Sequence, residues 1–124
     1  QEVALEFMAS PDWPRHTKRV GRTLAARRDH LLGELARLLP VVAGPILRPR
    51  AGYHLWVPCP DGWSSTEVTR VAHDAGIIVG DGAHAHADEP PRHDVRMSFG
   101  AVNEPTATQA LDRLAAALAS TPGR

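Results

Sequence analysis

The chain has 124 residues, which is enough for one domain with a modest hydrophobic core and too few for two. Its 14 Lys and Arg residues balance its 14 Asp and Glu residues, so the charge gives no reason to expect nucleic acid or a membrane surface as a partner of this segment. No run approaches the roughly 18 to 20 apolar residues that span a bilayer. Cys59 is the only cysteine, so a reducing, cytoplasmic compartment is expected. The sequence starts at Gln1 without a signal-peptide pattern, and we expect a segment of a longer protein.

The first 40 residues predict two helices that would connect domains. Residues 2–9 are expected to form a short helix that stops at Ser10-Pro11, and Asp12 is expected to cap the second helix. Apolar residues then recur at helical spacing up to Pro40, with charged residues on the opposite face. At about 1.5 Å per residue this helix would be roughly 38 Å long, which suits a connector between domains.

The remaining chain, residues 41–120, predicts an α/β sandwich. Strands are expected at residues 41–47, 52–58, 77–79 and 95–99, and a Pro/Gly/His-rich loop at 80–92. One helix should begin at a capping box of Ser64 and Glu67 and end at Gly76, and the last helix should begin at Asn103. This order predicts a single α+β domain over residues 1–124, in which helices cover one face of a small, mostly antiparallel sheet.

The last predicted strand places one arginine on the exposed side of that sheet. Because side chains alternate along a strand, Val95, Met97 and Phe99 would face the helices, while Arg96 and Ser98 would face away. A guanidinium matches a carboxylate with two parallel hydrogen bonds. On spacing alone, a solvated surface arginine is the more common explanation, and composition does not decide between the two.

A histidine-rich loop raises a metal site as a second candidate. The residues concerned are His84, His86 and His93, with Asp81 and Asp88. Their spacing matches no standard zinc pattern, so we favour a solvent-exposed polar loop and assign no metal ligand. The tryptophans are interpreted as core or interdomain anchors rather than as ligand-stacking residues: Trp13, Trp56 and Trp63.

Several segments resemble, in the right order, parts of the fold-type-I pyridoxal-phosphate aminotransferases. Residues 50–57 (RAGYHLWV), followed by Pro60-Asp61-Gly62, look like their glycine-aromatic-leucine-tryptophan strand. Residues 76–82 are similar to their "G-V-x-V-x-P-G" segment, and Glu89-Pro90-Pro91 with residues 95–99 (VRMSF) resemble the "R-L-S-F" strand that supplies an arginine for the substrate carboxylate. Two departures stand out: His54 replaces an apolar residue, and Asp81 replaces the proline.

The connector helix resembles one branch of this family in particular. Residues 13–16 (WPRH) and 26–31 (ARRDHL) are similar to the long interdomain helix of a branch that includes the MocR-type, GntR-like transcriptional regulators. In these regulators a winged-helix DNA-binding domain is fused to an aminotransferase-like domain. The resemblance of this helix therefore favours a regulator of this type as the parent protein. A free-standing aminotransferase is the alternative, and an unrelated ferredoxin-like binding module is a third hypothesis.

The resemblance also implies roles for residues and partners. This chain would be the C-terminal small domain, in which Arg96 binds the α-carboxylate of an amino acid or a similar effector, with Gly52 and Tyr53 nearby. The parent's own N-terminal large domain would hold pyridoxal 5′-phosphate, the parent would form a homodimer, and DNA would be bound only through a separate N-terminal domain. No catalytic residue is expected here, because Lys18 is the only lysine and lies on the charged face of the connector.

Overall fold

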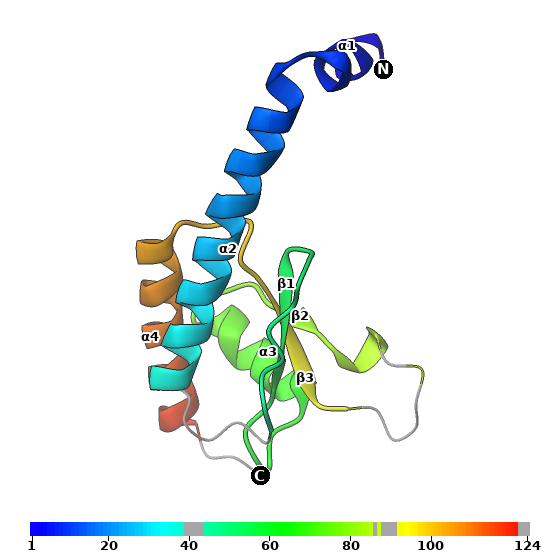
Figure 1. Ribbon diagram of the computed structural model, residues 1–124. Coiled ribbons are helices and arrows are strands. Elements are labelled where there is room, and N and C mark those ends of the chain that lie inside the picture. The colour runs from blue at the N-terminus through cyan, green and yellow to red at the C-terminus, as the bar shows by residue number, and fades with distance from the viewer. Residues whose placement is uncertain (39–43, 86, 88–91, 122–124) are drawn as a thin grey trace.

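The computed structural model describes residues 1–38, 44–85, 87 and 92–121. Its elements follow in the order α1 (Glu2–Ala9), α2 (Asp12–Leu38), β1 (His54–Pro58), α3 (Ser65–Asp74), β2 (Gly80–Asp81), the 3-10 helix η1 (Ala83–Ala85), β3 (Asp94–Ser98) and α4 (Glu104–Ser120). In Figure 1, α2 and α4 lie side by side next to the sheet, and α1 stands away from it at the far end of α2. Within the described residues, no helix has the length and apolar character needed to cross a membrane.

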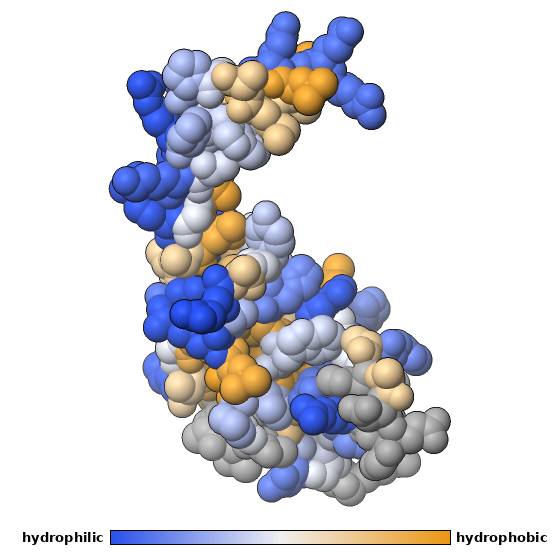
Figure 2. Space-filling view, turned by 45° about the vertical axis from the view of Figure 1, so that its right-hand side comes forward, coloured by the Kyte–Doolittle hydropathy of each residue, from blue (hydrophilic) through white to orange (hydrophobic). Residues whose placement is uncertain are grey.

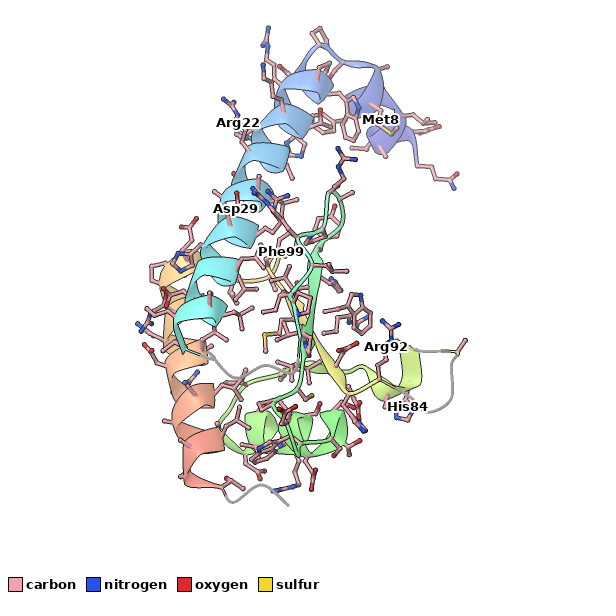
Figure 3. All side chains as sticks on the ribbon, turned by 60° about the horizontal axis from the view of Figure 1, so that its bottom comes forward. Met8, Arg22, Asp29, His84, Arg92 and Phe99 are labelled. Atoms are coloured by element: carbon pink, nitrogen blue, oxygen red, sulfur yellow. The ribbon has the colours of Figure 1, made fainter. Side chains whose placement is uncertain are left out.

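The sheet is antiparallel, with β3 between β1 and β2. Its inner face packs against α2, α3 and α4 to form one core, which includes Leu31, Leu35, Leu55, Val57, Val68, Ala72, Val95, Met97, Leu111 and Leu114. Phe99 follows β3 and lies between the sheet and α2 (Figure 3). The predicted α+β fold, with helices on one face of a small antiparallel sheet, is confirmed.

The helix ends in the second half of the chain follow the predicted signals. The Ser64 hydroxyl accepts a hydrogen bond from the Glu67 amide at 3.2 Å, and the Glu67 carboxylate accepts one from the Ser64 amide at 3.0 Å, which completes the capping box. Gly76 takes a φ of +74° after α3, a conformation that favours glycine. The Asn103 side chain accepts a hydrogen bond from the Thr106 amide and caps α4, as predicted.

Two predicted strands are not found among the described residues at their predicted positions; residues 41–43 of the first lie outside the described residues. Residues 44–47, the described part of the strand predicted at 41–47, are irregular; Pro45 lacks an amide hydrogen, and Leu47 is 79% exposed. The short strand expected at 77–79 lies further along the chain, at β2, and Ile78 is 92% exposed. In both segments isolated aliphatic residues favoured a strand, although too few of them face the core to fix one.

The predicted cap of the connector helix is also wrong. Asp12 is the first residue of α2 rather than its cap. The hydroxyl of Ser10 accepts a hydrogen bond from the Asp12 amide at 3.3 Å, while the Asp12 carboxylate pairs with Arg15 at 3.2 Å. Ser10 therefore satisfies a backbone donor that the sequence pattern assigned to Asp12.

Candidate functional site

Arg96 lies on the face of the sheet that the helices leave open. Along β3 the neighbouring Val95 and Met97 are buried, at 2% and 6% exposure, while Arg96 between them is exposed. This alternation follows from the pleat of the strand, and it confirms the predicted orientation of Arg96. Its guanidinium is directed away from the core, on a rigid central strand.

Two residues flank Arg96 on the adjacent strands. Trp56 of β1 is directly opposite Arg96 in one antiparallel pair, and Gly80 of β2 is opposite it in the other. Trp56 is 41% exposed, and its side chain shares the open face with Arg96 because directly paired residues point to the same side. Arg96 therefore sits between an indole and a residue without a side chain.

The Arg96 side chain lies across the Gly80 backbone. A Cβ atom added to Gly80 would be 3.3 Å from Cβ, 3.2 Å from Nε and 3.6 Å from Nη2 of Arg96. The Cβ, Nε and Nη2 atoms of Arg96 thus all lie near Gly80, so the arginine side chain extends along the surface of β2. Any side chain at position 80 would compete for the space that the guanidinium occupies.

Gly52 and Tyr53 lie at the start of β1, further along the sheet. Gly52 has a φ of +90°, and this left-handed turn brings the chain into β1. The Tyr53 carbonyl accepts a hydrogen bond from the Phe99 amide at 2.9 Å, and a Cβ added to Gly100 would lie 3.2 Å from the Tyr53 ring. Gly52 and Tyr53 together line a cleft of about 280 Å³ against α2.

A larger cleft joins Tyr53 to the open face of the sheet. It measures about 660 Å³, and its wall includes Tyr53, the cross-strand pair His54 and Ser98, and two arginines of α2. The arginines are Arg19 and Arg27. Figure 2 shows the molecule hollowed between the projecting N-terminal helices and the body of the domain. Arg96 is not among the residues that line this cleft. The cleft therefore brings Tyr53 and Ser98 together, while Arg96 lies two residue pairs along the sheet from the His54–Ser98 pair.

The described wall of the larger cleft carries positive charge. Its lining includes Arg19 and Arg27, with no Asp or Glu among the described lining residues. Arg27 is fixed by a hydrogen bond that its Nη1 donates to the Gly100 carbonyl at 3.1 Å. In a chain whose acidic and basic residues balance, this concentration of guanidinium groups favours an anionic ligand.

The Cys59 thiol and the Asp81 carboxylate are reactive groups, but both are held within the fold. Burial, reinforced by the charges of Asp94 and Asp81, raises the pKa of the Cys59 thiol from 9.0 to about 12, so no thiolate is available near neutral pH. Burial opposes ionisation of Asp81, but the neighbouring Ser65 hydroxyl, the Ala83 amide and the Thr66 hydroxyl outweigh it and lower the pKa of Asp81. The carboxylate accepts hydrogen bonds from Thr66 at 2.7 Å and from Ala83 at 2.9 Å, and so holds the turn after β2.

The metal hypothesis involves residues that the structure describes only in part. His84 lies in η1, while His86 and Asp88 are outside the described residues. Across the part of the chain that is described, no group of three or more His, Cys, Asp or Glu side chains converges on a common point.

The residues of this chain do not fit covalent attachment of pyridoxal phosphate. Attachment requires a lysine amine inside a pocket. Lys18 is the only lysine in the sequence, and it is exposed on α2.

Sequence reasoning missed Gly80 as a possible site residue and gave Trp56 only an anchoring role. Position 80 falls where the sequence predicts a loop, so its pairing with Arg96 was not foreseen. The alternation that placed Arg96 outward would also have placed Trp56 outward, since Leu55 and Val57 on either side of it are apolar and buried. A tryptophan predicted to point away from the core, on the same face as Arg96, was therefore the signal in the sequence that could have identified Trp56 as a site residue.

Comparison with known proteins gives likeness at the level of structure. No protein-family model matches the chain, and no curated protein matches it. Among solved structures, LysN, the α-aminoadipate aminotransferase of Thermus thermophilus complexed with N-(5′-phosphopyridoxyl)-L-leucine, has a TM-score of 0.80 at 22% identity, covering 92% of this chain and 29% of that one.

Two further solved structures give the same result. The kynurenine aminotransferase of Pyrococcus horikoshii, in complex with PMP, has a TM-score of 0.79 at 24% identity, covering 94% of this chain and 29% of that one. The multiple substrate aminotransferase of Thermococcus profundus has a TM-score of 0.78 at 20% identity, with the same coverage. The chain thus spans less than a third of each of these proteins, and it has the fold of an aminotransferase-like domain.

Proposed function

We propose that this chain is the small C-terminal domain of a pyridoxal-phosphate-dependent aminotransferase, and that Arg96 binds the α-carboxylate of its amino-acid or 2-oxo-acid substrate. The observation that carries the proposal is the placement of a single arginine on the open face of the central strand, in a domain whose fold matches aminotransferases over more than nine-tenths of its length. The cofactor and its lysine would belong to the large domain of the parent protein.

The chemistry of the open face supports this role. A rigid strand holds Arg96 between Trp56 and Gly80, so the planar fork of its guanidinium is available for a bidentate pair with a carboxylate. The cationic cleft beside His54 and Ser98 adds positive potential on the same side of the domain. When the large domain encloses this face, the exclusion of water would strengthen each of these interactions.

A second candidate is a MocR-type regulator, in which the same site would sense an amino-acid-like effector. The sequence of the connector helix, residues 13–16 and 26–31, favours this branch. The solved structures named above are all described as aminotransferases, which favours the enzyme. The same likeness gives no support to an unrelated ferredoxin-like module. Assays of the full-length parent for amino-group transfer and for binding to its own promoter DNA separate the two candidates.

The role of Arg96 is tested by substitution in the full-length parent. Arg96→Ala is expected to weaken binding of carboxylate ligands by about 10- to 100-fold, since it removes two charge-assisted hydrogen bonds. Arg96→Lys should give an intermediate loss, because lysine keeps the charge but not the planar fork. Binding is measured by calorimetric titration with L-leucine, L-glutamate and 2-oxoglutarate.

The matched control is Arg22→Ala. Arg22 is an exposed arginine of α2 that points away from the sheet (Figure 3), so its loss removes the same charge at a distance from the site. Equal affinities for wild type, Arg22→Ala and Arg96→Ala would show that Arg96 does not bind the carboxylate.

A further inference from the structure

We propose that Gly80 is a positioning residue for Arg96: the missing side chain at this position orients the guanidinium for its carboxylate ligand. The inference rests on the proposed function of Arg96 and adds a determinant that neither composition nor strand spacing reveals. It concerns the packing of one side chain over the neighbouring strand.

The first step is the contact itself. Gly80 pairs directly with Arg96, and an added Cβ would lie 3.3 Å from the arginine Cβ and 3.2 Å from its Nε. Directly paired side chains in antiparallel sheets usually have Cβ atoms about 4.5–5.5 Å apart. The Arg96 side chain therefore lies closer to β2 than an ordinary cross-strand neighbour would allow.

The second step is that backbone conformation gives no reason for a glycine here. The glycines with positive φ among the described residues are Gly52, Gly62 and Gly76, so Gly80 has a conformation open to any L-residue. A β-branched residue would even be favoured at a strand position. What a side chain would disturb is Arg96, whose Nη2 would be 3.6 Å from the new Cβ.

The third step is the opposite wall. Trp56 occupies the position across from Arg96 on β1, with its side chain on the same face. A residue larger than glycine on β2 would push the arginine toward Trp56 or outward from the sheet. Because a bidentate pair depends on the plane of the guanidinium, a displacement of a few tenths of an ångström changes the fit without removing the charge.

The test uses Gly80→Ala and Gly80→Val in the full-length parent, titrated by calorimetry with the same three probes, L-leucine, L-glutamate and 2-oxoglutarate. Affinity is expected to fall about 3-fold for Gly80→Ala and about 10-fold or more for Gly80→Val, in proportion to the bulk introduced beside the guanidinium. The thermal midpoint of unfolding should stay level or rise, because replacing glycine in a strand favours folding. Opposite signs for binding and stability distinguish positioning from a general loss of structure.

A double-mutant cycle ties the effect to Arg96. With Arg96→Lys in place there is no planar fork to misalign, so adding Gly80→Val should change the affinity by less than about 2-fold. Gly33→Ala is the control, since an added Cβ at Gly33 in α2 meets nothing within 4 Å and should leave binding unchanged.

The outcomes separate the two proposals. If Arg96→Ala weakens binding but Gly80→Val does not, the positioning role of Gly80 is wrong while the proposed function stands. If Gly80→Val weakens binding equally in the Arg96→Lys background, Gly80 acts through another group, and the inference is again overturned. If Arg96→Ala itself has no effect, the proposed function fails.

Discussion

At Gly82 the chain passes so close to β3 that there is no room for a side chain. The Gly82 amide donates a hydrogen bond to the Asp94 carbonyl at 2.9 Å, and a Cβ at position 82 would collide with that same carbonyl. Unlike the side chain beside Gly80, this obstacle is backbone and has little freedom to move away. Gly82→Ala is therefore expected to lower the free energy of unfolding by about 1–3 kcal/mol, measured by urea denaturation.

Gly33→Ala supplies the matched comparison for Gly82→Ala. Position 33 is helical and open, so the same substitution should raise the free energy of unfolding by about 0.5–1 kcal/mol. If Gly82→Ala left the stability unchanged, the close approach of residue 82 to β3 would be incorrect.

The orientation of Arg96 was predictable at the residue scale, whereas its surroundings were not. The alternation of Val95, Arg96 and Met97 required knowledge of one strand alone. The contact with Gly80 depends on which strand lies beside β3 and in what register, and a sequence in which residues 80–92 look like a loop does not contain that information. Gly52 and Tyr53 were grouped with Arg96 on the resemblance alone, and the structure places them at the clefts beside α2.

Among the elements, α3 has the clearest local signals. Its capping box satisfies the amides of both Ser64 and Glu67, and the Ser64 hydroxyl lies 2.8 Å from the Glu67 carboxylate. Ser64→Ala is expected to lower the free energy of unfolding by about 1 kcal/mol, because the Glu67 amide loses its acceptor. Thermal and urea denaturation measure the change.

Two variants test whether capping is the cause. Ser64→Asp restores an acceptor at the cap and should recover most of the stability. Ser120→Ala removes an exposed hydroxyl at the end of α4, which donates to the Ala117 carbonyl at 3.0 Å, and should change the stability by less than about 0.5 kcal/mol. Equal losses from Ser64→Ala and Ser64→Asp would count against the capping argument.

The elements that sequence predicted well have local causes, and those it missed do not. The caps of α3 and α4 and the amphipathic stripe of α4 depend on residues that are close in the sequence. The sequence therefore predicted where these two helices begin. The strand predicted at 41–47 and the position of β2 depended on pairing partners. Ile78 and Leu47 are apolar but exposed, and no local pattern separates them from residues that face a core.

On the scale of the whole molecule, α1 stands out because it does not pack into the core of the domain. It has eight residues and buries none of them. Helices this short are marginal in water without tertiary packing. Its contacts are with the start of α2, where the Phe7 ring meets Trp13 at 5.6 Å and His16 at 5.3 Å between centroids. The large apolar residues of α1 are all exposed: Val3, Leu5, Phe7 and Met8, of which Phe7 is the least exposed.

Under the proposed function, a large domain of the parent protein would cover these side chains. Replacing both Val3 and Leu5 by Ser in the full-length parent should then lower its free energy of unfolding by about 3 kcal/mol, because each buried aliphatic side chain contributes roughly 1.5–3 kcal/mol. Glu6→Ser, an exposed position on the same helix, controls for altered helix propensity. If the double substitution leaves the thermal and urea unfolding of the parent unchanged, α1 is exposed to water in the parent. The hollow beneath α1 would then be open to solvent rather than closed by a second domain.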